Sequence, residues 1–108
     1  MDPVEVGDGA PLSIDISGEP EELVVALTGE LDISNVSILD ARVDEALDGR
    51  PTMLVFDLAH LRFLDSSGIG LLLRVASKVE TVRLRRPSDI VRQIVRYMGL
   101  SDVLPIEP

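Results

Sequence analysis

The 108-residue chain contains no cysteine, no tryptophan and a single histidine, and its formal net charge is −9. Without cysteine it has no disulfide framework, no thiol redox switch and no thiolate metal site. The negative charge argues against general binding to nucleic acid or anionic membranes, because both depend on cationic surfaces. No apolar stretch approaches the ~20 residues of a membrane span, and the first residues lack the regions of a secretory signal. We therefore expect a cytoplasmic protein with neither nucleic acid nor membrane as a partner.

Hydrophobic residues make up 45% of the chain, enough for one domain whose core needs no covalent staples. The charges are unevenly distributed along the sequence. Residues 1–65 hold 15 of the 19 acidic residues, and residues 66–108 hold seven of the ten basic residues. The basic side chains either form an ordinary solvated surface or contact an acidic patch on a partner.

Residues 1–11 have the composition of a flexible acidic tail, and residues 12–108 are predicted to form the folded domain. Strands that alternate with helices imply right-handed crossovers and a largely parallel sheet. The predicted fold class is α/β, with a single mixed, largely parallel sheet opened by an antiparallel hairpin. In chain order, the periodicity predicts strands over 12–16 and 23–28 around a turn at Gly18 and Pro20, and then a helix capped by Ser34 and ended by Gly49 and Pro51. A buried strand over 52–58 follows, with His60 in the loop after it, and then a helix from Asp65. The last predicted elements are a strand over 79–84, a helix between Ser88 and Gly99, and a short strand over 103–106. The apolar residues of this last helix, Val91, Ile94, Val95 and Met98, share one face.

The segment Phe-Leu-Asp-Ser-Ser-Gly-Ile-Gly at residues 63–70 joins a strand to an apolar helix. Asp65 has the side chain of a helix N-cap, so Ser66 and Ser67 fall in the first turn, where free N–H groups and the helix dipole favour a phosphate. Gly68 and Gly70 would let another protein approach the backbone closely. The alternative is an ordinary capped helix whose small residues pack against a neighbour.

This helix is apolar on more than one side. Ile69, Leu72, Leu73 and Ala76 form the expected inward stripe, and Leu71 and Val75 lie on a second side. Either the helix is deeply buried or part of it is a partner surface. We take Leu71 to be the exposed, partner-facing residue.

A second polar segment, Gly29-Glu30-Leu31-Asp32, follows the strand over 23–28. In parallel sheets functional residues gather at the carboxyl ends of strands, so we expect Asp32 and Ser66 to be neighbours. The alternative for Asp32 is a turn residue that leads into the next helix.

Enzymatic alternatives find little support in the sequence. A serine hydrolase needs a base beside the nucleophile, but His60 is the only histidine and there is no G-x-S-x-G elbow. Gly68-Ile69-Gly70 matches only part of a dinucleotide fingerprint, and no phosphate-binding loop for ATP is present. Asp32, Asp57 and Asp65 have no metal-ligand spacing. We predict no enzymatic activity, no cofactor and no metal site.

Four segments of the chain resemble the STAS domain family, and within it the single-domain anti-sigma factor antagonists of bacteria. They are LTGELDISNV at 27–36, LVFDLAHLRFLDSSGIGLLL at 54–73, RLRRPSDIVRQIV at 83–95 and MGLSDVLPI at 98–106. The resemblance covers about Leu12 to Ile106 and implies a STAS-like fold. It is most specific in the D-S-S-G element.

The resemblance also implies a function. Family members bind an anti-sigma factor, usually a serine kinase, and so release a sigma factor. Ser66 matches the serine that this kinase phosphorylates to end the binding, and a serine phosphatase resets it. Asp32, Asp65, Ser67, Gly68 and Leu71 complete the predicted partner surface. A STAS adaptor or scaffold subunit that does not switch, for a lipid transporter or a stress-signalling complex, and a serine-nucleophile enzyme are the alternatives.

Overall fold

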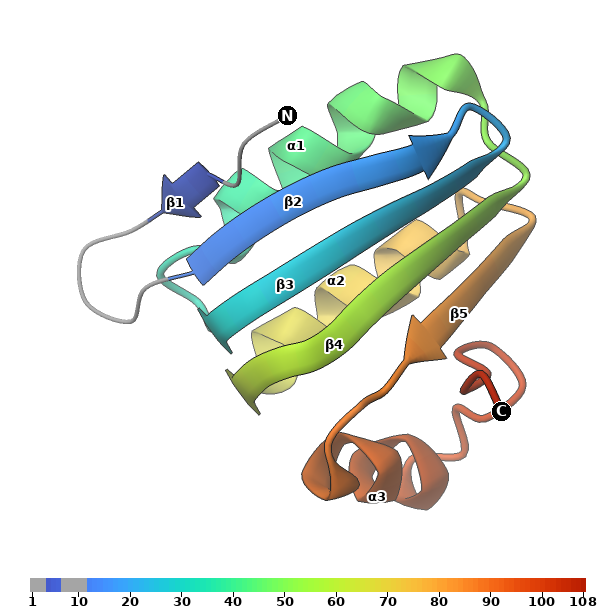
Figure 1. The fold of residues 1–108 in the computed structure, drawn as a ribbon. Helices are drawn as coiled ribbons and strands as arrows, with labels where there is room; N and C mark the ends of the chain where they lie inside the picture. The colour runs from blue at the N-terminus through green and yellow to red at the C-terminus, as the bar shows by residue number, and fades with distance from the viewer. Residues whose placement is uncertain (1–3, 7–11) are drawn as a thin grey trace.

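The computed structural model describes residues 4–6 and 12–108, which form one sheet with helices against it (Figure 1). The strands follow each other across the sheet in the order β1-β2-β3-β4-β5. The elements are β1 (Val4–Val6), β2 (Leu12–Glu19), β3 (Glu22–Leu31), α1 (Val36–Ala46), the short 3-10 helix η1 (Leu47–Gly49), β4 (Met53–Leu64), α2 (Ser66–Ala76), β5 (Thr81–Arg85) and α3 (Asp89–Tyr97).

The first strands pair antiparallel and the later ones parallel. β2 and β3 form the hairpin, and β3, β4 and β5 run in the same direction. The connections through α1 and α2 place both helices on the same face of the sheet and leave the other face without a helix (Figure 1). The α/β class with an antiparallel hairpin and parallel strands is therefore confirmed.

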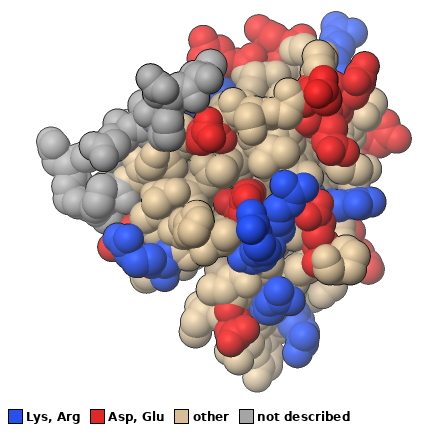
Figure 2. Space-filling model, viewed as in Figure 1, with Lys and Arg blue, Asp and Glu red and all other residues tan. Residues whose placement is uncertain are grey.

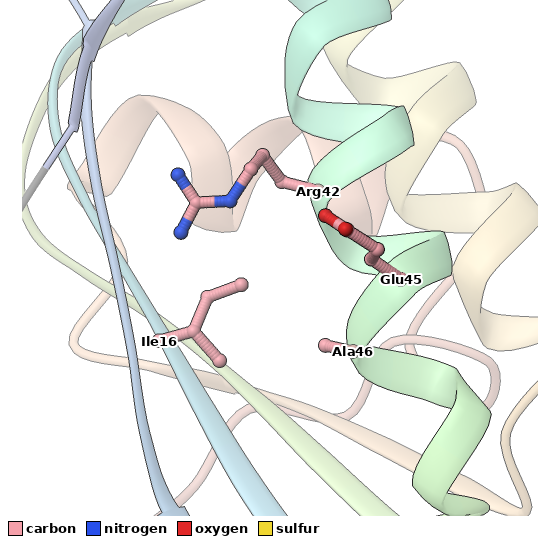
Figure 3. A pocket seen from close by; sticks show the side chains of 4 residues that line it. All are labelled: Ile16, Arg42, Glu45 and Ala46. Carbon is pink, nitrogen blue, oxygen red and sulfur yellow. The ribbon is translucent and has the colours of Figure 1, made fainter. Parts of the chain in front are cut away.

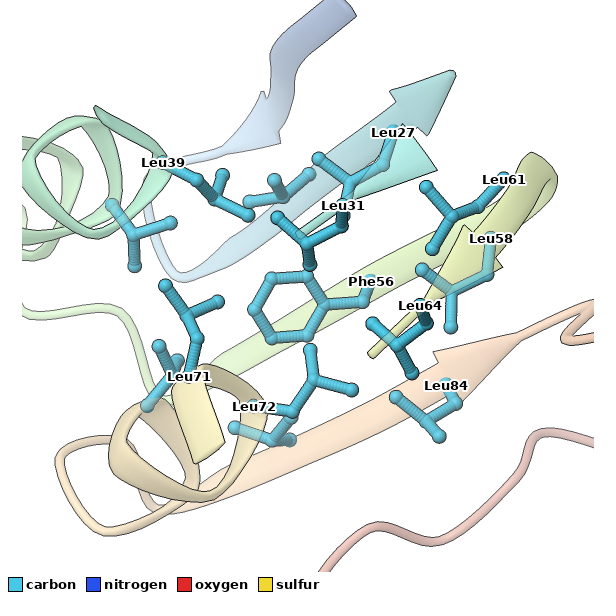
Figure 4. Close-up of a cluster of buried hydrophobic side chains, with 14 of the residues drawn as sticks. Leu27, Leu31, Leu39, Phe56, Leu58, Leu61, Leu64, Leu71, Leu72 and Leu84 are labelled. Carbon is cyan, nitrogen blue, oxygen red and sulfur yellow. The ribbon is translucent and has the colours of Figure 1, made fainter. Parts of the chain in front are cut away.

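The core lies between the sheet and this pair of helices. Phe56 on β4 is fully buried at its centre, surrounded by leucines from the strands and from α2 (Figure 4). Side chains of a strand point alternately to its two faces, so Leu54, Phe56 and Leu58 share one face of β4 and Asp57 lies on the other. A register shift between Asp57 and His60 returns Leu61 to the buried cluster. Burial of this leucine-rich face is the main force that holds the helices on the sheet.

Several predicted boundaries were wrong. β4 continues to Leu64, so His60 lies within a strand and not in a loop. Helix α1 begins at Val36 with Asn35 at the N-cap position, and Ser34 instead hydrogen-bonds to Asp32. Its end is followed by η1 and by Arg50 in a left-handed conformation, where the sequence predicted Gly49 as the terminator.

Both ends of the chain add to the sheet. Within the predicted tail, Val4–Val6 pairs antiparallel with β2, and the rest of that prediction lies outside the described residues. After α3, Ile106 forms a single parallel bridge with Leu84 where a short strand was predicted. In the described part of the chain, no helix is long and apolar enough to cross a membrane.

The two oppositely charged parts of the sequence meet in the fold. Asp40 and Asp44 on α1 pair with Arg74 and Lys78 at α2, at 3.5 and 2.9 Å. On the open face of the sheet, where Figure 2 shows basic and acidic side chains side by side, Arg86 pairs with Asp57. Several basic residues of the second part of the chain thus form ion pairs with acidic residues of the first part on the protein surface.

Candidate functional site

Asp65 caps α2, as predicted. Its backbone is extended, and its carboxylate accepts hydrogen bonds from the N–H groups of Ser67 at 2.9 Å and Gly68 at 3.2 Å. The hydroxyl of Ser67 donates to the same carboxylate oxygen. These bonds satisfy N–H groups that the first turn of a helix leaves free.

The two serines of the motif therefore differ in their surroundings. Ser67 is half-buried and its hydroxyl is bound to Asp65. Ser66 is exposed, and within the described residues its hydroxyl has no hydrogen-bond partner. Ser66 is the first residue of α2, where the positive end of the helix dipole favours negative charge. Of the two hydroxyls, that of Ser66 is the one accessible to another protein.

The same hydrogen bonds lower the pKa of Asp65. The Ser67 hydroxyl has the largest effect, and the N–H groups of Gly68, Ser67 and Ile33 act in the same direction, while partial burial opposes them. The carboxylate is therefore ionised at neutral pH. One negative charge already lies beside the Ser66 hydroxyl.

The Asp32 loop lies against this capped end, as expected from the parallel sheet. The N–H of Asp65 donates to the carbonyl of Leu31 at 3.3 Å, and the backbone N–H of Ile33 helps to lower the pKa of the Asp65 carboxyl. The loop also repeats the cap geometry, because the carboxylate of Asp32 accepts hydrogen bonds from the N–H and the hydroxyl of Ser34. The structure thus brings together the two segments that the sequence singled out.

Asn35 holds the Asp32 loop in shape, and the sequence reasoning missed it. Its side chain is fully buried, accepts a hydrogen bond from the N–H of Asp32 at 3.0 Å and donates one to the carbonyl of Glu30 at 2.9 Å. A buried amide normally has such partners. An Asp-x-x-Asn spacing after a strand is the signal that would have identified it.

The two glycines of α2 have different surroundings. A Cβ atom on Gly68 would lie 2.4 Å from Cδ1 of Leu64 and 3.1 Å from Cδ2 of Leu31, so this glycine permits close packing of the helix on the strand ends. A Cβ atom on Gly70 would meet only a guanidinium nitrogen of Arg74 at 3.8 Å. Packing within the domain therefore explains Gly68 and leaves Gly70 unexplained.

The prediction that Leu71 faces a partner was wrong. Leu71 is fully buried and belongs to the same cluster as Phe56 and Leu39 (Figure 4). The reason is that α2 packs against α1 as well as the sheet, so its second apolar side is covered. Leu73, predicted to point inward, is only half-buried.

Apolar hollows flank α3 next to Ser66. One, of about 210 Å³, is lined by Leu64, Asp65, Ser66, Ile69, Ile94 and Met98. Met98, predicted on the same face of α3 as the buried Val91 and Val95, is 57% exposed at the rim of this hollow. The sequence reasoning did not include α3 in the site.

Another hollow lies between β2 and α1 and is lined by Ile16, Arg42, Glu45 and Ala46 (Figure 3). None of the predicted site residues lines it. The described residues contain no group of three or more His, Cys, Asp and Glu side chains that could hold a metal ion.

Comparison with known proteins agrees with this geometry. An anti-sigma F factor antagonist of Lysinibacillus sphaericus is 35% identical over 75% of this chain and 74% of its own length. The unphosphorylated form of the anti-sigma factor antagonist SpoIIAA superposes with a TM-score of 0.77 at 29% identity, covering 88% of each chain. The phosphorylated form of the Bacillus cell-fate determinant SpoIIAA superposes with a TM-score of 0.71 at 28% identity, covering 88% of this chain and 91% of its own.

A family profile matches almost the whole described domain. Residues 11–105 match the profile described as Mlab, STAS domain. This range contains the hairpin, the parallel strands and the capped helix with the exposed serine. Together with the relatives above, the match shows that the chain belongs to the STAS domain family.

Proposed function

We propose that this domain is an anti-sigma factor antagonist: it binds an anti-sigma factor through the surface around Ser66 and releases it when Ser66 is phosphorylated. The observation that carries the proposal is the exposed hydroxyl of Ser66 at the first position of α2. Relatives that carry the name anti-sigma F factor antagonist, and a SpoIIAA structure in the phosphorylated form, support it.

The anti-sigma factor is then also the kinase. The described residues include no phosphate-binding loop, so the phosphate must come from a partner with its own ATP site, and a serine phosphatase restores the active form. The domain itself acts by binding and not by catalysis. Its regulatory relatives are consistent with this role.

Phosphorylation changes the surface without threatening the fold. A phosphate adds roughly −1.5 to −2 charge, which the N-terminal end of α2 stabilises through its dipole and free N–H groups. The carboxylate of Asp65 is ionised beside it, so the phosphate adds to an existing negative potential. A partner surface that accepts the hydroxyl now meets a concentrated negative charge.

The size of this effect is sufficient for a switch. Like charges brought together at an interface cost several kcal/mol, and about 1.4 kcal/mol corresponds to a tenfold change in affinity. We therefore expect phosphorylation to weaken binding by about a hundredfold or more.

The test is calorimetric titration of Ser66 variants against the cognate anti-sigma factor. Ser66→Ala should bind like the wild type and resist phosphorylation, and Ser66→Asp should bind much more weakly while melting close to the wild type. Ser17→Asp is the matched control, because Ser17 is exposed at the end of β2, beside the start of β3 and away from Ser66.

Phosphorylation by the kinase is measured by mass spectrometry on the same proteins. A single phosphate on the wild type and none on Ser66→Ala is expected. Phosphate on Ser67 instead, or equal affinity of wild type, Ser66→Asp and the phosphorylated protein, would refute the switch. The second result would favour a STAS adaptor that does not switch.

A further inference from the structure

Large apolar side chains remain exposed along α3, next to the proposed switch. Ile90 is 64% exposed and Met98 57% exposed. With Ile94, which is half-buried, they lie four residues apart and so share one side of the helix. The buried side of α3 is formed by Val91 and Val95. The helix therefore has a second apolar stripe that residues 4–6 and 12–108 leave largely exposed.

The stripe borders two adjoining hollows at the carboxyl end of β4. The hollow of about 210 Å³ is lined in part by Ile94, Met98 and Ser66. A neighbouring hollow of about 370 Å³ is lined in part by Ile90 and the half-exposed Phe63. Leu64 lines both. Exposed apolar surface that is concentrated at one place typically marks an interaction site.

We propose that these hollows bind a segment of the anti-sigma factor that inserts large apolar side chains. This inference rests on the proposed function. Ser66 lines the hollow itself, so a kinase whose active site reaches this hydroxyl must also cover Ile94 and Met98. The occupant of the hollows is therefore the same protein that phosphorylates the domain.

The arrangement also explains how charge at Ser66 could act on an apolar contact. Burying an apolar side chain in the hollow removes water from the Ser66 position as well, because both belong to the same lining. A phosphate there must keep its hydration, since removing water from an unpaired charge is very costly. Phosphorylation therefore opposes both the contact at the hydroxyl and the filling of the hollow beside it.

The absence of native cysteine allows a direct test. Ile90→Cys and Met98→Cys replace exposed side chains, and Ser67→Cys reports on the start of α2. Val103→Cys is the control, because Val103 is 47% exposed but lines a separate hollow with Glu80 and Thr81. The rate of alkylation by N-ethylmaleimide is measured by mass spectrometry, alone and with saturating anti-sigma factor. Melting curves and co-elution establish that each variant folds and binds.

We expect the partner to slow alkylation at positions 90 and 98 by about tenfold or more, as for a well-covered contact, and to leave position 103 unchanged. In addition, Met98→Asp should weaken binding by about tenfold or more, and Val103→Asp should not. Protection at position 67 alone would overturn the inference and leave the proposed function standing.

Two other outcomes would also overturn it. If the wild type forms no complex with any anti-sigma factor, the proposed function and this inference fail together. If positions 90 and 98 become protected at high protein concentration without a partner, and sedimentation shows dimers, the hollows bind a second copy of the chain.

Discussion

Gly68 and Gly70 offer a test of the packing of α2, because they lie two residues apart in the same helix and differ in their surroundings. Glycine inside a helix is less favourable than alanine by roughly 0.5–1 kcal/mol. At Gly70 an added Cβ atom meets only Arg74 at 3.8 Å, which is ordinary contact. Gly70→Ala should therefore raise the free energy of unfolding by about 0.5–1 kcal/mol, or the melting temperature by about 2–8 °C.

At Gly68 the same methyl group has no space. It would lie 2.4 Å from Cδ1 of Leu64, and both Leu64 and the neighbouring Leu31 are buried. The end of the Leu64 side chain must move, and overpacking of this kind costs about 1–3 kcal/mol. We expect Gly68→Ala to be less stable than Gly70→Ala by about that amount, in spite of the same gain in helix propensity.

Urea denaturation followed by circular dichroism measures both values, with unchanged m-values as the check on two-state unfolding. The affinity for the anti-sigma factor should not rise with stability, because Gly70 is half-exposed near Ser66 and an added methyl group there would lie at the partner surface. We expect Gly70→Ala to be more stable than the wild type and to bind more weakly. Two variants of equal stability, or a destabilised Gly70→Ala, would refute the packing argument.

The remaining predictions concern the core, the cap and the end of α3. Leu71→Ala should lower the free energy of unfolding by about 2–5 kcal/mol, because Leu71 is fully buried, and a Leu71→Glu protein that melts like the wild type would contradict this burial. Asp65→Ala should cost about 0.5–2 kcal/mol through loss of the cap. The pKa of Asp65 is lowered from 3.8, so the stabilisation by its charge is present above that value and is lost as the pH falls through the lower, folded-state pKa. When the free energy of unfolding is measured against pH, Asp65→Asn should therefore lose less stability below pH ~4 than the wild type. Gly99→Ala should cost about 1–2 kcal/mol by thermal melting, because Gly99 has a φ of +70° and its added Cβ atom would meet no neighbour.

Local patterns were enough to predict the architecture. The alternating apolar residues of β2, the nearly continuous apolar run at the start of β4 and the caps at Asp65 and Ser88 are interactions between residues close in the chain. Such signals act through backbone propensity and hydrogen bonds within one turn. The order of strands and helices follows from them, and the common edge of Asp32 and Asp65 follows from the parallel sheet.

The sequence by itself therefore determined the α/β class, the Asp65 cap with a serine at the start of α2, and the position of this helix start beside the Asp32 loop. Only the tertiary structure decided which apolar side chains remain exposed. Periodicity could not distinguish Leu71, which is fully buried, from Met98, which remains 57% exposed, because burial depends on residues distant in sequence. The same holds for the two serines, since the hydrogen bond that occupies Ser67 and leaves Ser66 accessible depends on the geometry of the folded cap.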